Sequence, residues 1–512
     1  MKNYRIIIYI VFCALFVNTM CTENRALAAV LLLDRNGFNL KAFLELGGDA
    51  IFVPHANFGA GSYPSSSSRT ARRSPVYSEL FETFGLDCTA ALGRRISLTA
   101  RASAINATTL GDGDAQEVSS TSGYPDFIGL EEANIGLRYR FRDTSKDALL
   151  LLLGRQRFIV DDGFLLAKGT YNGGDRAAWM YAPRFAFSGP GVLTLQTAPV
   201  RADFFVLQNN SNQVLARGDD RPETKFAGFD TTWFINGPSG DGRSVYKARA
   251  AYMTLTYFYI YDADTSLTFN NSVRGDRKGM QVGSMAFGAI FSQIPHVRRW
   301  PEWIRGLEIH GHYVIEYNNE VANGYSGTSA WATYAEPAYT FFSHTWKPRI
   351  SYRFVEYSGG KNPSGGEKHS YDTMFQIDGT RMFYGGYWPG EISGNYLARL
   401  SDLRVHQIDL TVTPPIHLAS TQDTVKLGLH YYNLSIPHPR GLYLSQNDHR
   451  FSNELDFSME WNVTPATSIS FATGAALSSR AARAFARSGQ IGRPLNIGDW
   501  SGIVEMYFSQ SL

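Results

Sequence analysis

The sequence predicts an all-β protein, a transmembrane antiparallel up-and-down β-barrel of about 18 strands (16–18). Three observations lead to this prediction: the composition, a repeated alternation of apolar and polar residues, and the lack of a long apolar run after the N-terminus. The 512 residues include 28 Tyr, 33 Phe, 9 Trp and 48 Gly, but only 18% are charged. Chains rich in aromatic residues and glycine, with few charges, are typical of many strands joined by turns.

Alternation recurs along the chain and places successive side chains on opposite faces of a sheet. It is clearest in IGLRYRF (135–141), LEIHGHYVIEY (307–317), TVKLGLHYY (424–432) and NELDFSMEWNV (453–463). A soluble sandwich also alternates. Here the polar face carries charges of both signs, and aromatic residues end many apolar faces, which favours a wet lumen inside and lipid outside. Helical periodicity is confined to residues 478–489, which we expect to form a short loop helix.

The first 28 residues have the pattern of a secretory signal peptide. Lys2 and Arg5 precede an apolar run over 6–17, and the small-residue site at 26–28 predicts cleavage after Ala28, or after Ala29. We therefore expect one exported domain, a single barrel over 29–512. No later apolar run approaches the ~20 residues of a spanning helix. At roughly 27 residues for each strand and its connection, this length gives about 18 strands.

The connections and the chain end support a barrel. GPSGDGR (237–243), NNSVRGDRKG (270–279) and SGGKNPSGGEKHS (358–370) are polar, glycine-rich segments that predict loops, the last of them outside the membrane. The C-terminal WSGIVEMYFSQSL alternates like a closing strand. A barrel of this size is too wide for wall side chains to fill, so we expect a channel. Cleavage would leave Cys88 as the single cysteine, which excludes a disulfide scaffold.

Several arginines lie opposite the apolar face. In PRISYRFVEYSGGKNP (348–363), Arg349 and Arg353 alternate with Ile350, Tyr352 and Phe354. We expect the arginines to face the lumen, and Arg138 and Arg140 to do the same. Each arginine either selects anions or braces the wall against an acid such as Glu356 or Glu132.

The direction of Arg155 is open, because five consecutive leucines precede it. If Leu149, Leu151 and Leu153 face lipid, Arg155 lies on their side, near an interface. If Leu150 and Leu152 face lipid, Arg155 points inward.

Eight stretches resemble, in order, the alginate-export family of outer-membrane barrels. They are LEEANIGLRYRF (130–141), LLGRQRFIVDDG (152–163), ADFFVLQ (202–208), ATYAEPAYTF (332–341), YSGGKNP (357–363), YDTMFQ (371–376), YGGYWPGEISGNYLARL (384–400) and VKLGLHYYNLSIP (425–437). The resemblance covers about 130–437. It implies a barrel of about 18 strands that passes an anionic polysaccharide or smaller solutes through an arginine-rich constriction, and it favours an inward Arg155.

The sequence-based hypothesis is therefore a channel in the Gram-negative outer membrane that exports an anionic polysaccharide or oligosaccharide, resembling alginate, through an arginine-lined lumen. The alternative is a porin for uptake of small solutes. A barrel hydrolase, or an adhesin with a plugged lumen, ranks lower, and we expect no enzyme, since no catalytic motif is found. The expected partners are outer-membrane lipid, the barrel-assembly machinery, the anionic cargo and periplasmic export components. Near-balanced charges, 48 basic against 46 acidic, argue against nucleic acid.

No cofactor or metal is expected. His310 and His312 share a strand face with Glu308 and Glu316, and such spacing can chelate a metal. Polar lining of the lumen explains these residues more simply. Asp161 and its neighbour Asp162 could hold calcium in a loop, but solvated loop acids are the simpler interpretation.

Overall fold

The computed structural model describes the greater part of the chain from residue 29. The described residues are 29–61, 73–113, 126–142, 147–167, 169, 177, 185–210, 223–235, 250–263, 266–268, 271–275, 277–319, 327–360, 367–373, 390–396, 398, 400–442, 444–445, 447–487 and 496–511. The signal peptide predicted for 1–28 and the loop predicted for 237–243 lie outside them.

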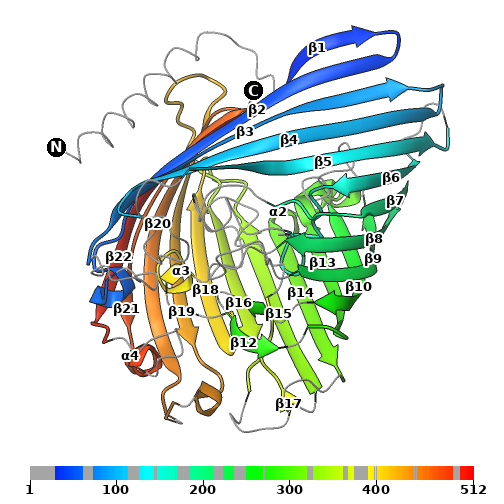
Figure 1. Ribbon diagram of the computed structural model, residues 1–512. Coiled ribbons are helices and arrows are strands. Elements are labelled where there is room, and N and C mark those ends of the chain that lie inside the picture. Colours follow the sequence, from blue (N-terminus) through cyan, green and yellow to red (C-terminus); the bar gives the residue numbers. More distant parts are fainter. Residues whose placement is uncertain are drawn as a thin grey trace.

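Eighteen antiparallel strands form a closed barrel, which confirms the predicted fold class (Figure 1). Neighbours along the chain pair with one another, and β22 pairs with β2 to close the wall. The barrel strands are β2 (Phe38–Phe52), β3 (Val76–Ala91), β4 (Ile96–Gly111), β5 (Asp126–Arg140), β6 (Ala148–Arg155), β7 (Gly191–Thr197), β8 (Val200–Asn210), β9 (Glu223–Ile235), β10 (Ala251–Ala263), β13 (Gln281–Ile290), β14 (Leu307–Asn318), β15 (Gly327–Thr340), β16 (Arg349–Tyr357), β18 (Leu403–Val412), β19 (Thr424–Ser435), β20 (Arg450–Thr464), β21 (Thr467–Ser478) and β22 (Trp500–Ser511).

The two faces of the wall follow the predicted alternation. The outer face exposes large apolar side chains from nearly every strand, such as Ile135, Leu137, Ile315, Ile350 and Tyr352. Their polar neighbours along each strand point to the other side. Closure leaves no wall strand with an unpaired edge, which a sheet in lipid requires because lipid offers no hydrogen bonds. The prediction fails at Val425 and Val463, which were expected on the outer face but are buried at strand ends beside turns.

A short additional strand extends one edge of the wall. β1 (Val30–Arg35) pairs with the first part of β2, and β22 pairs with the remainder of β2. Asn36 and Gly37, both with positive φ, make the turn between β1 and β2.

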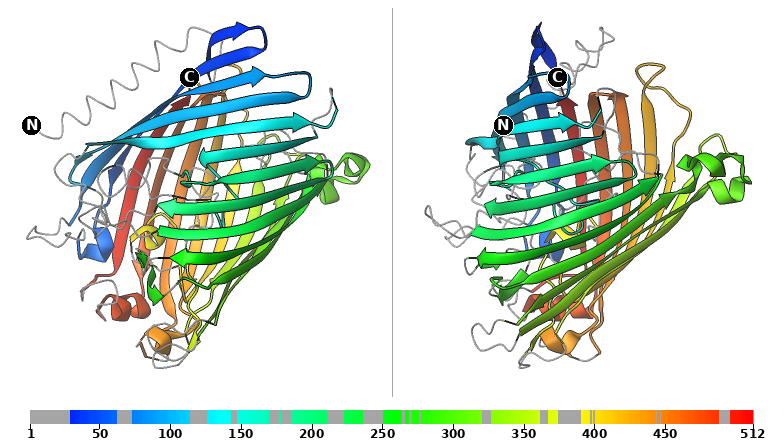
Figure 2. Two further views of the ribbon diagram at one scale, coloured as in Figure 1. Left: turned by 45° about the vertical axis from the view of Figure 1, so that its right-hand side comes forward. Right: turned by 90° about the vertical axis from the view of Figure 1, so that its right-hand side faces the viewer.

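Short and long connections lie at opposite ends of the barrel (Figure 2). The long connections carry η1 (Ala56–Gly59), the β11–β12 hairpin (Ser266–Thr268 and Asn271–Gly275), β17 (Glu367–Lys368), α3 (Ser393–Tyr396), η5 (Pro439–Leu442) and α4 (Arg480–Arg487), whereas η3 (Phe291–Gln293), η4 (Pro295–Arg299) and α2 (Glu302–Arg305) lie between β13 and β14. The helix expected within 478–489 is therefore confirmed. β12 of this hairpin occupies half of the segment expected to be the loop 270–279. None of the helices among the described residues is long and apolar enough to cross a membrane.

Two long connections fold into the barrel. Phe158, Phe164 and Phe187 of the β6–β7 connection pack in one apolar cluster with wall residues such as Val314 and Tyr334. These wall residues lie opposite the exposed outer side chains, so the contact is on the lumen side.

The β16–β18 connection contributes Tyr371, Ile392 and Leu400 to the same cluster. The described residues of this connection after residue 370 therefore return to the wall, and the two connections partly fill the lumen of the predicted channel. The physical reason is that these connections carry enough apolar and aromatic surface to pack against the wall rather than extend into water.

Candidate functional site in the barrel lumen

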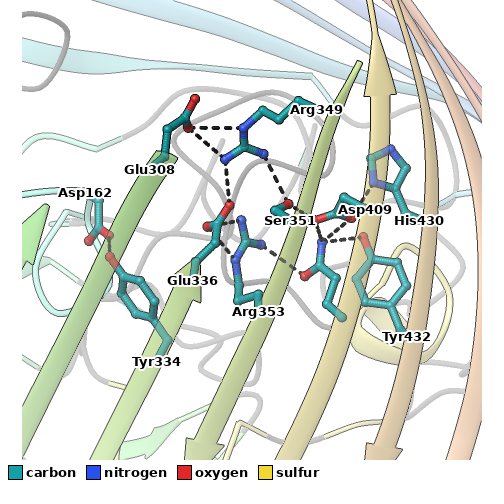
Figure 3. A network of polar contacts seen from close by, with 11 residues as sticks. Asp162, Glu308, Tyr334, Glu336, Arg349, Ser351, Arg353, Asp409, His430 and Tyr432 are labelled. Carbon is teal, nitrogen blue, oxygen red and sulfur yellow. Dashed lines mark hydrogen bonds and ion pairs between the residues drawn. The ribbon is translucent and has the colours of Figure 1, made fainter. Parts of the chain in front are cut away.

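The candidate site is a polar network on the inner faces of β14, β15, β16 and β18, shown in Figure 3. Arg349 and Arg353 lie four residues apart on β16, an even spacing, so both point to the side opposite Ile350 and Tyr352. Neighbouring strands supply the carboxylates around them. The sequence prediction that these two arginines share the inward face agrees with this placement.

Arg353 is held deep in the wall. Its Nε and Nη2 donate to Glu336 Oε2 at 3.0 and 2.8 Å, and its Nη1 donates to Gln407 Oε1 at 3.0 Å. Only 3% of its side chain is exposed. A buried guanidinium with both edges occupied offers little to a passing solute, so the geometry favours bracing of the wall over anion selection for Arg353.

Arg349 lies closer to the open lumen. Its guanidinium contacts two carboxylates, Glu308 Oε2 at 3.1 Å and Glu336 Oε1 at 3.1 Å, and Nη1 donates to Ser351 Oγ at 3.1 Å. Its side chain is 23% exposed. Because Arg349 lies on the inner face, this exposed part faces the lumen, although two glutamates offset its charge.

The network continues along the wall through Asp409. Gln407 Nε2 donates to both Asp409 oxygens at 2.8 and 3.0 Å, and Ser351 Oγ donates to Oδ2 at 3.2 Å. His430 Nδ1 lies 2.6 Å from Asp409 Oδ1, and His430 Nε2 lies 2.9 Å from Ser458 Oγ.

Ser458, His430 and Asp409 have the order of contacts found in a nucleophile, base and orienting acid. All three side chains are buried, so an ester could not reach the Ser458 hydroxyl without movement of the wall. Asp409 is also shared with Gln407 and Ser351, as in a structural network. The geometry therefore favours a bracing role for this trio over hydrolysis.

Arg138 and Arg140 lie near the short-turn end of β5. They alternate with the exposed Leu137 and Tyr139, so they belong to the inner face. Arg138 is half-buried and Arg140 is exposed. The structure does not bring them into the network around Arg349.

The placement of Arg155 matches neither of the two possibilities left by the leucine run. Leu149, Leu151 and Leu153 are the exposed leucines, yet Arg155 is buried and its Nε donates to the Glu131 carbonyl at 2.7 Å. The alternation ends at Gly154, whose φ is +105°. A positive φ of this kind is accessible to glycine, and it breaks the two-residue period.

A second polar region lies on the inner wall around the closing strands. Glu454 accepts hydrogen bonds from the N–H groups of Ile392 and Ser393 at 2.8 and 2.7 Å, which fastens the β16–β18 connection to β20. Asp456 and Glu505 are buried in the same part of the wall. Only β19 separates β20 from β18, the last strand of the arginine network. The lumen therefore carries both signs of charge.

Sequence reasoning missed Glu336, Gln407 and Asp409 as members of the site. Glu336 stands in AEPAY and Asp409 in HQIDL, each a polar residue in an alternating segment. Alternation identifies them as inward residues. Nothing local indicates that they meet Arg353 across strands.

No family model matches the chain, and no curated protein matches it. Among solved structures, Acinetobacter baumannii OccAB1 matches with a TM-score of 0.52 and 11% identity over 92% of this chain and 96% of that chain. In its fold, this chain is similar to OccAB1. Pseudomonas aeruginosa OccK2 (OpdF) and OpdK, the latter solved with vanillate, each match with a TM-score of 0.48, at 10% and 9% identity. They cover 92% of this chain and 97% and 98% of their own chains. At these identities, the likeness concerns the fold, and the comparisons do not support the resemblance to the alginate-export family in particular.

Proposed function

We propose that this protein is a passive porin of the Gram-negative outer membrane, selective for small solutes that carry a carboxylate. Uptake of small solutes was the alternative in the sequence analysis, and it now replaces polysaccharide export as the best-supported function. The closed barrel with an apolar outer face supports the location. The leader predicted for residues 1–28 supports export.

The main evidence for a small solute rather than a polymer is the inward packing of the two long connections. Phe164 from one connection and Tyr371 from the other contact Tyr357 of the wall, with ring centroids 5.9 and 5.7 Å away. All three rings are buried. Packed aromatic contacts inside the barrel take up room that a hydrated polymer would need, whereas a small solute requires only a narrow path.

The preference for a carboxylate rests on Arg349, Arg138 and Arg140. A guanidinium stays charged and presents paired donors to carboxylate oxygens, which replace part of the solute's hydration. Glu308 and Glu336 hold Arg349 in place but also reduce its net field. We therefore expect a moderate preference for anions and release of the solute after binding, as conduction requires.

Planar-bilayer recording of the refolded protein tests the proposal. We expect an open current with a moderate anion preference that a monomeric uronate or a small aromatic carboxylate reduces in a concentration-dependent way. Liposome swelling should show entry of monomeric uronates but exclusion of polyuronate chains. Passage of the polymer would favour the export function instead. A barrel that conducts nothing but cleaves p-nitrophenyl esters would contradict both transport functions.

A further inference from the structure

Three ionisable side chains that are distant in sequence meet inside the barrel. Asp161 and Asp162 belong to a tight turn of the β6–β7 connection, and His312 lies on the inner face of β14. One ligand atom from each residue lies within 4.8 Å of the other two, and all three side chains are buried. In the sequence the two acids lie far from the histidine, and a metal is the weaker explanation for each set taken alone.

The turn places both carboxylates on the lumen wall. Val160 N donates to the Leu166 carbonyl at 2.8 Å, and Gly163 N donates to the Val160 carbonyl at 3.0 Å. Tyr252 Oη donates to Asp161 Oδ2 at 3.2 Å, and Tyr334 Oη donates to Asp162 Oδ2. Such outer hydrogen bonds orient carboxylates around a metal in known sites.

The surroundings of His312 provide a second line of evidence for a ligand, separate from the grouping of the three side chains. None of its side-chain surface is exposed, and neither ring nitrogen has a hydrogen-bond partner among the described residues. Its Nδ1 lies 3.7 Å from Asp162 Oδ1, which is too far for a hydrogen bond. Phe164 and Tyr334 pack against its ring, with centroids 5.3 and 6.2 Å away. A buried imidazole without partners beside two carboxylates requires an explanation, because buried polar groups are otherwise almost always bonded.

We propose that Asp161, Asp162 and His312 bind one divalent transition-metal ion, with Zn²⁺ as the best-fitting choice. Imidazole is a ligand for zinc and its neighbours rather than for Mg²⁺ or Ca²⁺, which take oxygen ligands. Two carboxylates also offset the charge of the ion, whose coordination would draw the ligand atoms closer together than they now lie.

The ion would fasten the inward connection to the wall. Asp161 and Asp162 come from the connection and His312 from β14, so a bound metal crosslinks two elements about 150 residues apart. The proposal goes beyond solute transport and does not depend on which solute passes. It gives the metal a structural role, which is to fix the connection that narrows the lumen.

Zinc binding to the untagged, refolded full chain in detergent tests this proposal. After treatment with EDTA and dialysis, ZnCl₂ is titrated against a chromogenic zinc indicator, and CaCl₂ and MgCl₂ are titrated in parallel. We expect one tight Zn²⁺ site per chain, with much weaker binding of Ca²⁺ and Mg²⁺. His312→Gln should weaken Zn²⁺ binding by roughly 100-fold or more, since even outer-contact changes cost about 10- to 100-fold.

His310→Gln is the matched control, because His310 lies on the same strand and the same inner face but outside the cluster. This variant should bind Zn²⁺ like the wild type. The electrophoretic mobility shift of folded barrels confirms folding, and Asp162→Asn replaces His312→Gln if that variant fails to fold. No stoichiometric binding by folded wild type, or equal binding by His312→Gln and His310→Gln, would overturn the proposal.

Discussion

Arg353 of β16 and Glu336 of β15 form a buried ion pair, with Arg353 Nη2 2.8 Å from Glu336 Oε2. The two arginines first identified in the sequence therefore have different surroundings. Arg353 is enclosed by its partners, whereas Arg349 keeps part of its surface toward the lumen. This difference predicts that substitution of Arg353 changes stability, whereas substitution of Arg349 changes ion selectivity.

Arg353→Ser should lower the free energy of unfolding by about 3–5 kcal/mol, because it leaves Glu336 buried without its main partner. Denaturant titration of the protein refolded in lipid vesicles measures this change. Lys426→Ser is the control, since Lys426 lies 3.5 Å from Glu460 and the two side chains are 46% and 28% exposed. That exposed pair should contribute about 1 kcal/mol or less. Equal losses for the two variants would contradict the bracing role.

Arg349→Gln should shift the reversal potential toward cation selectivity. The change removes a lumen-facing positive charge and leaves Glu308 without its charged partner. We therefore expect a roughly two- to five-fold lower anion-to-cation permeability ratio. The reversal potential in a salt gradient measures it. Lys347→Gln removes the same charge from the β15–β16 turn and should have a much smaller effect. An unchanged reversal potential in Arg349→Gln would exclude its part in selectivity.

Gly154→Ala should destabilise the protein by about 1–3 kcal/mol, because φ at this residue is +105° and an added Cβ would lie 2.4 Å from the Ala133 carbonyl oxygen. The thermal midpoint of the mobility shift measures the change. Gly283→Ala provides the control, since a Cβ there meets nothing within 4 Å and its φ is not positive. Similar midpoints for the two variants would contradict a special role of Gly154 in ending the leucine alternation.

Asp423 gives a pH-dependent prediction. Burial alone would raise the pKa of its carboxyl, but hydrogen bonds from the Ala419 N–H, the Trp461 indole and the Leu418 N–H outweigh burial and keep the pKa well below its usual range. Since the folded-state pKa is the lower one, this stabilisation is complete above about pH 4 and is lost as the pH falls through the folded-state value.

Asp423→Asn should therefore lower the denaturation midpoint at neutral pH, and the difference from wild type should shrink in acid. Denaturant titrations at a series of pH values measure the trend. Asp34→Asn, at an exposed carboxyl of β1, should leave the midpoint unchanged. A difference between Asp423→Asn and wild type that stays constant with pH would contradict the proposed role of the carboxylate.

The wall of the barrel could be predicted from local sequence patterns alone. The two-residue period is a local property of each strand, and the face of a strand that contacts lipid must consist of apolar side chains. Residues such as Ile135, Ile315 and Ile350 were therefore assigned correctly to the outer face. The closing strand and the short helix over 480–487 followed from equally local patterns. The inward direction of Arg349 and Arg353 came from the same rule.

The contents of the lumen could not be predicted in this way. Whether a long connection folds inward and whether His312 meets Asp162 depend on contacts between segments far apart in the chain. Whether Arg353 meets Glu336 depends on the register of two neighbouring strands. Alternation gives the face on which a side chain lies, but it does not identify the partner of that side chain on another strand or connection. At Arg155 even the face could not be predicted from alternation. Five consecutive leucines fit either register of the strand, and the positive φ of Gly154 then breaks the alternation.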